Sequence, residues 1–240
     1  MNIFLIISLI ILGPLIGSLI GVMRKPTPRL LSSYLGFAAG VMIAISFLQL
    51  MPEALKLSPV IYVIIGFVMG FFIMMFFDDL VPHIHPGLCA KETPAIKRTA
   101  IMLLIGIALH NFPEGLAISS GFASMGRLGL AIAFGIALHN IPEGIVTAAP
   151  LYASTGKRLK SFLLSFSIMV PTLLAFFLGI FLFGFISNTL LGIIMAITAG
   201  IMFYISGDEL IPCAERQKHT HSANIGMALG VIAVLLTTLI

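Results

Sequence analysis

The chain has 240 residues, of which 59% are hydrophobic and only 9% are charged, and its mean hydropathy is +1.15. These values exclude an ordinary soluble domain and indicate an all-α, polytopic membrane protein. The formal net charge of +4 could suit a nucleic-acid partner. However, the basic residues are concentrated in alternate loops, which argues against that partner.

Long apolar stretches predict eight transmembrane helices, which occupy most of the sequence. The predicted spans cover residues 3–22, 33–52, 59–78, 99–120, 128–149, 161–184, 189–208 and 222–240. No soluble domain fits between these spans. We therefore expect residues 1–240 to form a single transmembrane domain.

Lysine and arginine residues are concentrated in the loops that follow spans one, three, five and seven. Eleven of the thirteen lie there: Arg24, Lys25, Arg29, Lys91, Lys97, Arg98, Lys157, Arg158, Lys160, Arg216 and Lys218. By the positive-inside rule these loops face the cytoplasm. Both termini are then predicted to lie outside the cytoplasm.

A ten-residue phrase that occurs twice is the most informative feature of the sequence. GIALHNFPEG covers residues 106–115 and GIALHNIPEG covers residues 135–144, with nine of the ten letters the same. Both copies place a histidine, an asparagine and a glutamate inside a predicted span, where ionisable groups are costly. A single histidine there would more often be a hydrogen-bonded structural residue. Duplication of the whole set favours a cation site.

The spacing within each copy brings the polar side chains together. Positions i and i+4 share a helix face, so each histidine stands over its glutamate, with the asparagine one step aside. In antiparallel neighbouring spans both copies would reach the same depth. Two imidazoles and two carboxylates suit Zn²⁺ or another borderline ion, and the asparagine oxygens favour a second, weaker site. The predicted metal ligands are His110, Asn111, Glu114, His139, Asn140 and Glu143.

A second internal similarity relates spans two and seven. AGVMIAISFLQLMPEA at residues 39–54 and AGIMFYISGDELIPCA at residues 199–214 are identical at eight of sixteen positions. These two spans cross the membrane in opposite directions, so the similarity predicts an inverted repeat, as in many secondary transporters. The corresponding arrangement is 3+2+3, with spans one to three mirrored by spans six to eight. The alternative is a chance likeness between two helices rich in small residues.

The duplicated phrase resembles spans four and five of the ZIP (ZRT/IRT-like) metal transporters, most closely their bacterial GufA-like branch. SFLQLMPEAL in span two, FFDDLVPHIH after span three and YISGDELIP in span seven extend the resemblance over nearly the whole chain. It implies an eight-helix ZIP fold, a homodimer in the inner membrane of a prokaryote, and a binuclear site at the midplane. It also implies movement of Zn²⁺, with Fe²⁺, Mn²⁺, Co²⁺ and Cd²⁺ as further candidate cargo, toward the cytoplasm.

The resemblance also assigns ligands to each metal. The first metal would take His110, Glu114, His139 and Glu143, and the second would take Asn111, Glu114, Asn140 and Glu143. Many family members complete the second shell with a glutamate directly before the proline of span six. This chain has Val170 before Pro171, and its sixth span contains no carboxylate. We therefore expect the second site to be weak or vacant.

Further candidate metal ligands lie on the predicted cytoplasmic side. His83, His85, His219 and His221 could accept ions that leave the path, although solvated loop histidines are an equal alternative. Asp208 and Glu209 end span seven, and the resemblance makes Glu209 a candidate exit ligand. Asp78 and Asp79 end span three, where capping or pairing with loop cations is as good an explanation.

An intramembrane zinc-dependent hydrolase is the main alternative to a transporter. Such an enzyme needs a metal-bound water and a separate general base beside it. No unassigned Glu, Asp or His is left at mid-depth, so the sequence favours a transporter that is not an enzyme and has no resident cofactor. A metal sensor would need a signalling domain, and the loops are too short for one.

Overall fold

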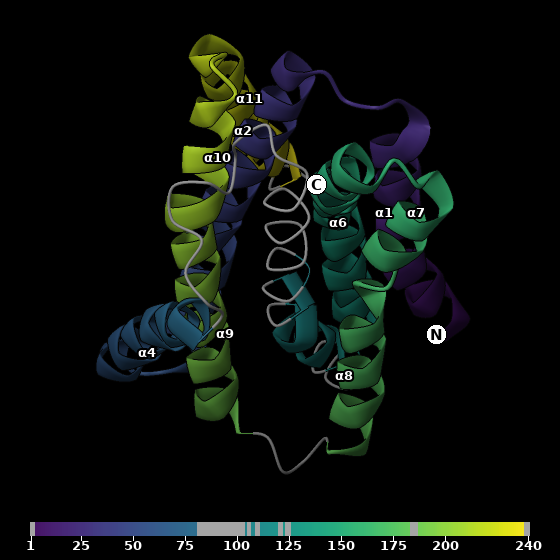
Figure 1. Cartoon of the computed structure of the whole chain (residues 1–240). Helices are drawn as coiled ribbons and strands as arrows, with labels where there is room; N and C mark the ends of the chain where they lie inside the picture. Colours follow the sequence, from purple (N-terminus) through teal and green to yellow (C-terminus); the bar gives the residue numbers. More distant parts are fainter. Residues whose placement is uncertain are drawn as a thin grey trace.

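The computed structural model describes residues 3–80, 104, 107–108, 111–119, 122, 126–182 and 187–237 (Figure 1). All regular structure in these ranges is helical, as the composition predicted. Residues 111–119 are helical, and the other elements are α1 (Ile3–Met23), α2 (Pro28–Ile45), η1 (Ser46–Leu50), α3 (Met51–Leu57), α4 (Val60–Leu80), α6 (Gly126–Thr155), α7 (Arg158–Phe166), α8 (Met169–Phe181), α9 (Asn188–Ile205), η2 (Ser206–Leu210), α10 (Ile211–Arg216) and α11 (Thr220–Thr237).

Within the described ranges, five helical segments are long and apolar enough to cross a membrane. They are Ile3–Met23, Pro28–Leu57, Val60–Asp78, Arg158–Phe181 and Asn188–Arg216, and Thr220–Leu236 is a shorter apolar helix. Large apolar side chains also remain exposed along α1, α4 and α8. Such faces are unfavourable in water and suit contact with lipid. The structure therefore fits a polytopic membrane protein.

Two parts of the chain fold into the same series of elements. The series α2, η1, α3 and α4 is matched by α9, η2, α10 and α11, and each starting residue is displaced by 160 positions, as in Pro28 and Asn188. The first helix of each series is capped by a hydroxyl side chain, Thr27 in one and Ser187 in the other. In Figure 1, α2 descends while α9 rises, so the two series run in opposite directions.

A π-helical turn interrupts each series at the same place, in η1 and in η2. The backbone N–H of Met51 donates to the carbonyl of Ser46, and that of Ile211 donates to the carbonyl of Ser206. The next residue in each case is a proline, which has no N–H to continue the α-helical pattern. A wide turn of this kind is a local change in helix geometry that is frequent at functional sites.

Glycine residues allow pairs of helices to pack backbone against backbone. Gly13 and Gly17 of α1 meet the carbonyls of Ala137 and Ile141 of α6, in parallel order. The pairs α2 with α11 and α4 with α9 are built in the same way. Small residues at every fourth position let transmembrane helices approach this closely. The contacts therefore determine the relative height of each pair of helices.

Candidate metal centre

The first copy of the duplicated phrase packs against α8. Asn111 is fully buried, and its side-chain Nδ2 donates a hydrogen bond of 2.8 Å to the backbone carbonyl of Ile168. One turn later, a Cβ atom at Gly115 would overlap the carbonyl oxygen of Thr172. The Oδ1 atom of Asn111 is buried and has no hydrogen-bond partner. This copy is thus tied to α8 through one side of its amide.

The second copy lies in the middle of α6 and packs against α1. Asn140 is fully buried, with its Cβ beside Gly13, and neither its Oδ1 nor its Nδ2 has a hydrogen-bond partner. One turn later, Gly144 packs against Gly17 and Ser18. An orphaned buried amide is costly, typically by about 1–3 kcal/mol for each polar group. Both polar atoms of the Asn140 amide are therefore available to a polar ligand.

The two glutamates of the phrase are also inside the protein. Glu114 is 4% exposed and Glu143 is 1% exposed. Every lysine and arginine side chain that the structure describes is exposed. A carboxylate in a buried site is a good ligand for a divalent cation. The glutamates are therefore suited to bind a metal ion.

The residues that flank the two copies fall into common clusters of buried residues in opposite order. At one end Ile107 and Val146 belong to a common cluster of buried residues, and at the other Ile118 shares a cluster with Ala133 and Ile136. This order is the one that antiparallel packing of the two segments gives. Along both segments the buried glutamates and asparagines lie between these two clusters.

The predicted histidine ligands fall largely outside the described residues. His110 is not among them, and neither are His83, His85 and the side chain of Asp79. His139 lies in α6, directly before Asn140, but its side chain is not described.

A second acidic group forms where α4 and η2 meet. Oxygen atoms of Asp78, Asp208 and Glu209 all lie within 4.8 Å of one another, and Glu209 is 7% exposed. The Tyr204 hydroxyl donates a 3.3 Å hydrogen bond to Asp78 Oδ2. The sequence prediction named Asp208 and Glu209 as candidate exit ligands but left Asp78 open. The parallel packing of α4 on α9 brings Asp78 to them.

The other candidate histidines do not join this group. His219 and His221 are exposed, near the start of α11. Within the part of the chain that the structure describes, neither belongs to a cluster of three or more metal-binding side chains. The described part of the structure therefore does not support a metal site at His219 or His221.

Val170 does not face the first copy. Its side chain is 43% exposed, whereas the buried face of α8 is formed by Thr172, Ala175, Phe176 and Gly179. Val170, the position at which the family resemblance led us to look for a glutamate, therefore lies outside the buried face of α8.

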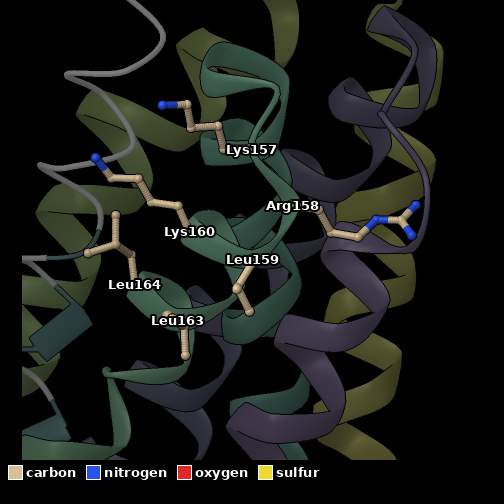
Figure 2. Close-up of a pocket in the computed structure, with 6 residues that line it drawn as sticks. All are labelled: Lys157, Arg158, Leu159, Lys160, Leu163 and Leu164. Carbon is tan, nitrogen blue, oxygen red and sulfur yellow. The ribbon is translucent and has the colours of Figure 1, made fainter.

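A hollow of about 630 Å³ lies beside α7, apart from these polar groups (Figure 2). It is lined by Lys157, Arg158, Leu159, Lys160, Leu163 and Leu164. Lys157 and Lys160 extend to one side, while Arg158 turns to the other, where its Nη2 donates a 2.7 Å hydrogen bond to the carbonyl of Met23. Without a carboxylate or histidine in its lining, this hollow is not a metal site.

An apolar helical bundle that buries carboxylate and amide side chains defines a membrane protein with an internal polar site. Comparison with known proteins identifies the family. Residues 89–238 match the family described as ZIP zinc transporter. Proteins named zinc transporter ZupT from Salmonella heidelberg (strain SL476), Salmonella paratyphi A (strain ATCC 9150 / SARB42) and Salmonella newport (strain SL254) are each 42% identical over 229 residues. These matches cover 90% of this chain and 88% of each relative. The chain belongs to the ZIP family, whose members are transporters rather than enzymes.

Proposed function

We propose that this protein carries divalent metal cations across the inner membrane of a bacterium toward the cytoplasm. Zinc is the principal cargo, because the family and the similar Salmonella proteins are described as zinc transporters. Fe²⁺, Mn²⁺, Co²⁺ and Cd²⁺ are further candidates, since sites of nitrogen and oxygen ligands bind divalent ions in order of intrinsic affinity.

The buried Asn140 amide is the observation that carries this proposal. Its two polar atoms lack partners in the interior of α6, and Glu143 lies on the next turn with an exposure of only 1%. A bound cation would give the amide oxygen a partner and would balance buried carboxylate charge at the same time. A purely structural role would leave the Asn140 amide unsatisfied.

The duplicated phrase supplies two sets of ligands in this proposal. The first metal takes His110, Glu114, His139 and Glu143, a nitrogen and oxygen set suited to Zn²⁺. The second metal takes the two asparagines and shares the two glutamates. Because α8 adds no carboxylate to this shell, the second metal binds more weakly than the first.

The helix pairs support a 3+2+3 inverted repeat of eight spans. With the spans numbered along the chain, the glycine contacts pair spans one and five, two and eight, three and seven, and four and six. Exchanging spans one to three with six to eight, and four with five, leaves this set of pairs unchanged. Such symmetry is typical of transporters whose substrate binds near the midplane between repeats.

The proposed path leaves the midplane toward the acidic cluster of Asp78, Asp208 and Glu209. The uneven distribution of lysine and arginine supports a cytoplasmic position for the adjoining loops and a position outside the cytoplasm for both termini. A dense group of carboxylates at that end attracts a departing cation. The family resemblance further implies that the active unit is a homodimer.

Zinc uptake into proteoliposomes tests the proposed site. Glu143→Ala should lower the initial rate by more than about tenfold, because it removes a ligand from a metal site. Glu53→Ala is the matched control, since Glu53 is exposed and pairs with the exposed Lys56 at 2.6 Å. Exposed pairs of this kind contribute little, so this variant should resemble the unaltered protein. Unchanged uptake by Glu143→Ala would refute the site.

A further inference from the structure

Thr172 of α8 faces the first copy of the duplicated phrase. Asn111 contacts Ile168, Gly115 lies against Thr172, and residues 111–119 therefore run parallel to α8. A helical side chain leans toward the N-terminus of its own helix. The side chain of Thr172 is therefore directed from the level of Gly115 toward that of Asn111.

The hydroxyl group of Thr172 lacks the hydrogen bond that other threonines of this protein make. Thr147, Thr155 and Thr198 each donate to the carbonyl four residues earlier, at 2.7–2.8 Å. For Thr172 that carbonyl belongs to Ile168, which already accepts the amide of Asn111. Thr172 is fully buried, and its Oγ1 has no hydrogen-bond partner.

Two oxygens without hydrogen-bond partners thus lie on facing helices about one helical turn apart, Thr172 Oγ1 on α8 and Asn111 Oδ1 on residues 111–119. Each is buried in an apolar bundle, where an unsatisfied polar atom is costly. A valine would fill the volume of Thr172 without that cost. Retention of the hydroxyl therefore points to a ligand that enters between the two helices.

We propose that Thr172 Oγ1 accepts a hydrogen bond from a water molecule of the partly hydrated divalent cation that Asn111 and Glu114 bind. This inference rests on the proposed function and extends it to span six. A neutral hydroxyl is a poor direct ligand for Zn²⁺, which prefers nitrogen, sulfur and carboxylate oxygen. It is a good partner for metal-bound water, which is a strong hydrogen-bond donor. Thr172 is thus a positioning residue for the hydrated ion.

Thr172→Val removes the hydroxyl and preserves the shape of the side chain. In proteoliposomes of the full chain, the KM for zinc should rise roughly fivefold with little change in maximal rate, because one hydrogen bond is lost. Thr172→Ser keeps the hydroxyl and should restore the KM. In metal-free detergent solution, Thr172→Val should unfold at the same or a higher temperature than the unaltered protein, since the orphaned group is gone.

These measurements distinguish a role of Thr172 in zinc binding from a purely structural role, and they test the proposed function separately. A normal KM for Thr172→Val overturns the inference, and so does a raised KM with lowered thermal stability that serine does not correct. Glu143→Ala serves as the parallel reference: if it transports normally, the proposed site itself fails. If Thr172→Val does not fold, Thr172→Ala takes its place, with the same expected rise in KM and the same serine comparison.

Discussion

The two copies of the duplicated phrase have nearly the same sequence but different polar surroundings. In the first copy the Asn111 amide donates to the Ile168 carbonyl on α8, which leaves only its oxygen unsatisfied. In the second copy the Asn140 amide lies beside α1 and has no partner at either polar atom. The helix that packs against each copy therefore decides how its asparagine is held.

The partner helices differ at one corresponding position. A Cβ at Gly115 would meet the backbone nitrogen of Phe176, and one at Gly144 would meet that of Ser18, so these two contacts are equivalent. Four residues earlier, α8 has Thr172 and α1 has Pro14. Proline has no hydroxyl and no N–H, so α1 offers less hydrogen bonding at this level. The backbone packing is thus common to both copies, while the polar chemistry is not.

Gly115→Ala and Gly144→Ala should have the largest effects, because the backbone contacts of both copies leave no room for a Cβ atom. At Gly144 this atom would approach the Ser18 nitrogen to 2.7 Å. We expect each variant to lose at least about 1–3 kcal/mol of stability, with transport impaired. Thermal unfolding in detergent measures this loss.

Gly135→Ala is the matched control for these two changes. It lies in the same phrase as Gly144, and a Cβ there meets nothing within 4 Å. This variant should be as stable as the unaltered protein or slightly more stable, since alanine favours helix by about 1 kcal/mol. Equal stability of all three variants would contradict the close packing described above.

Replacement of the two asparagines by leucine should change stability to different extents. Asn140→Leu removes two unsatisfied polar atoms and should stabilise the metal-free protein by about 1–3 kcal/mol. Asn111→Leu removes only one unsatisfied atom and also breaks the bond to Ile168, so the two effects oppose each other and stability should change by less than about 1 kcal/mol. Unfolding with a chelator present measures the difference, and zinc binding should weaken in both variants. Equal stabilisation by both replacements would mean that the two asparagines are held in the same way.

Removal of a serine hydroxyl beside each copy should give the smallest difference in stability between two variants. Ser165 Oγ donates to the Gly144 carbonyl at 3.0 Å and lies 2.8 Å from Ser18 Oγ, so it joins α7 to both α6 and α1. Ser119 Oγ donates only within its own helix, to Leu116. Ser165→Ala should cost about 1 kcal/mol, and Ser119→Ala about half that or less. A larger loss for Ser119→Ala in the unfolding assay would reverse this assignment.

The sequence by itself predicted the structural class of the protein and its family. Composition predicted an all-helical membrane protein, and the duplicated phrase with its flanking motifs identified the ZIP family, and both predictions are confirmed. The similarity between residues 39–54 and 199–214 also corresponds to a real structural match, since both stretches contain a π-helical turn before a proline. These features depend on local chemistry, which is readable along the chain.

Contacts between distant helices were decided only by the tertiary structure. The sequence showed Asp78, Asp208 and Glu209 at the ends of two helices, but only the packing of α4 on α9 brings them within 4.8 Å of one another. The sequence also gave no reason to single out Thr172. Its hydroxyl is recognised as unsatisfied only in the structure, where the Ile168 carbonyl accepts a hydrogen bond from Asn111 instead. The height and rotation of one helix against another depend on interlocking glycine contacts between segments far apart in the chain. The sequence pattern within a single helix does not determine its height or rotation against a neighbouring helix.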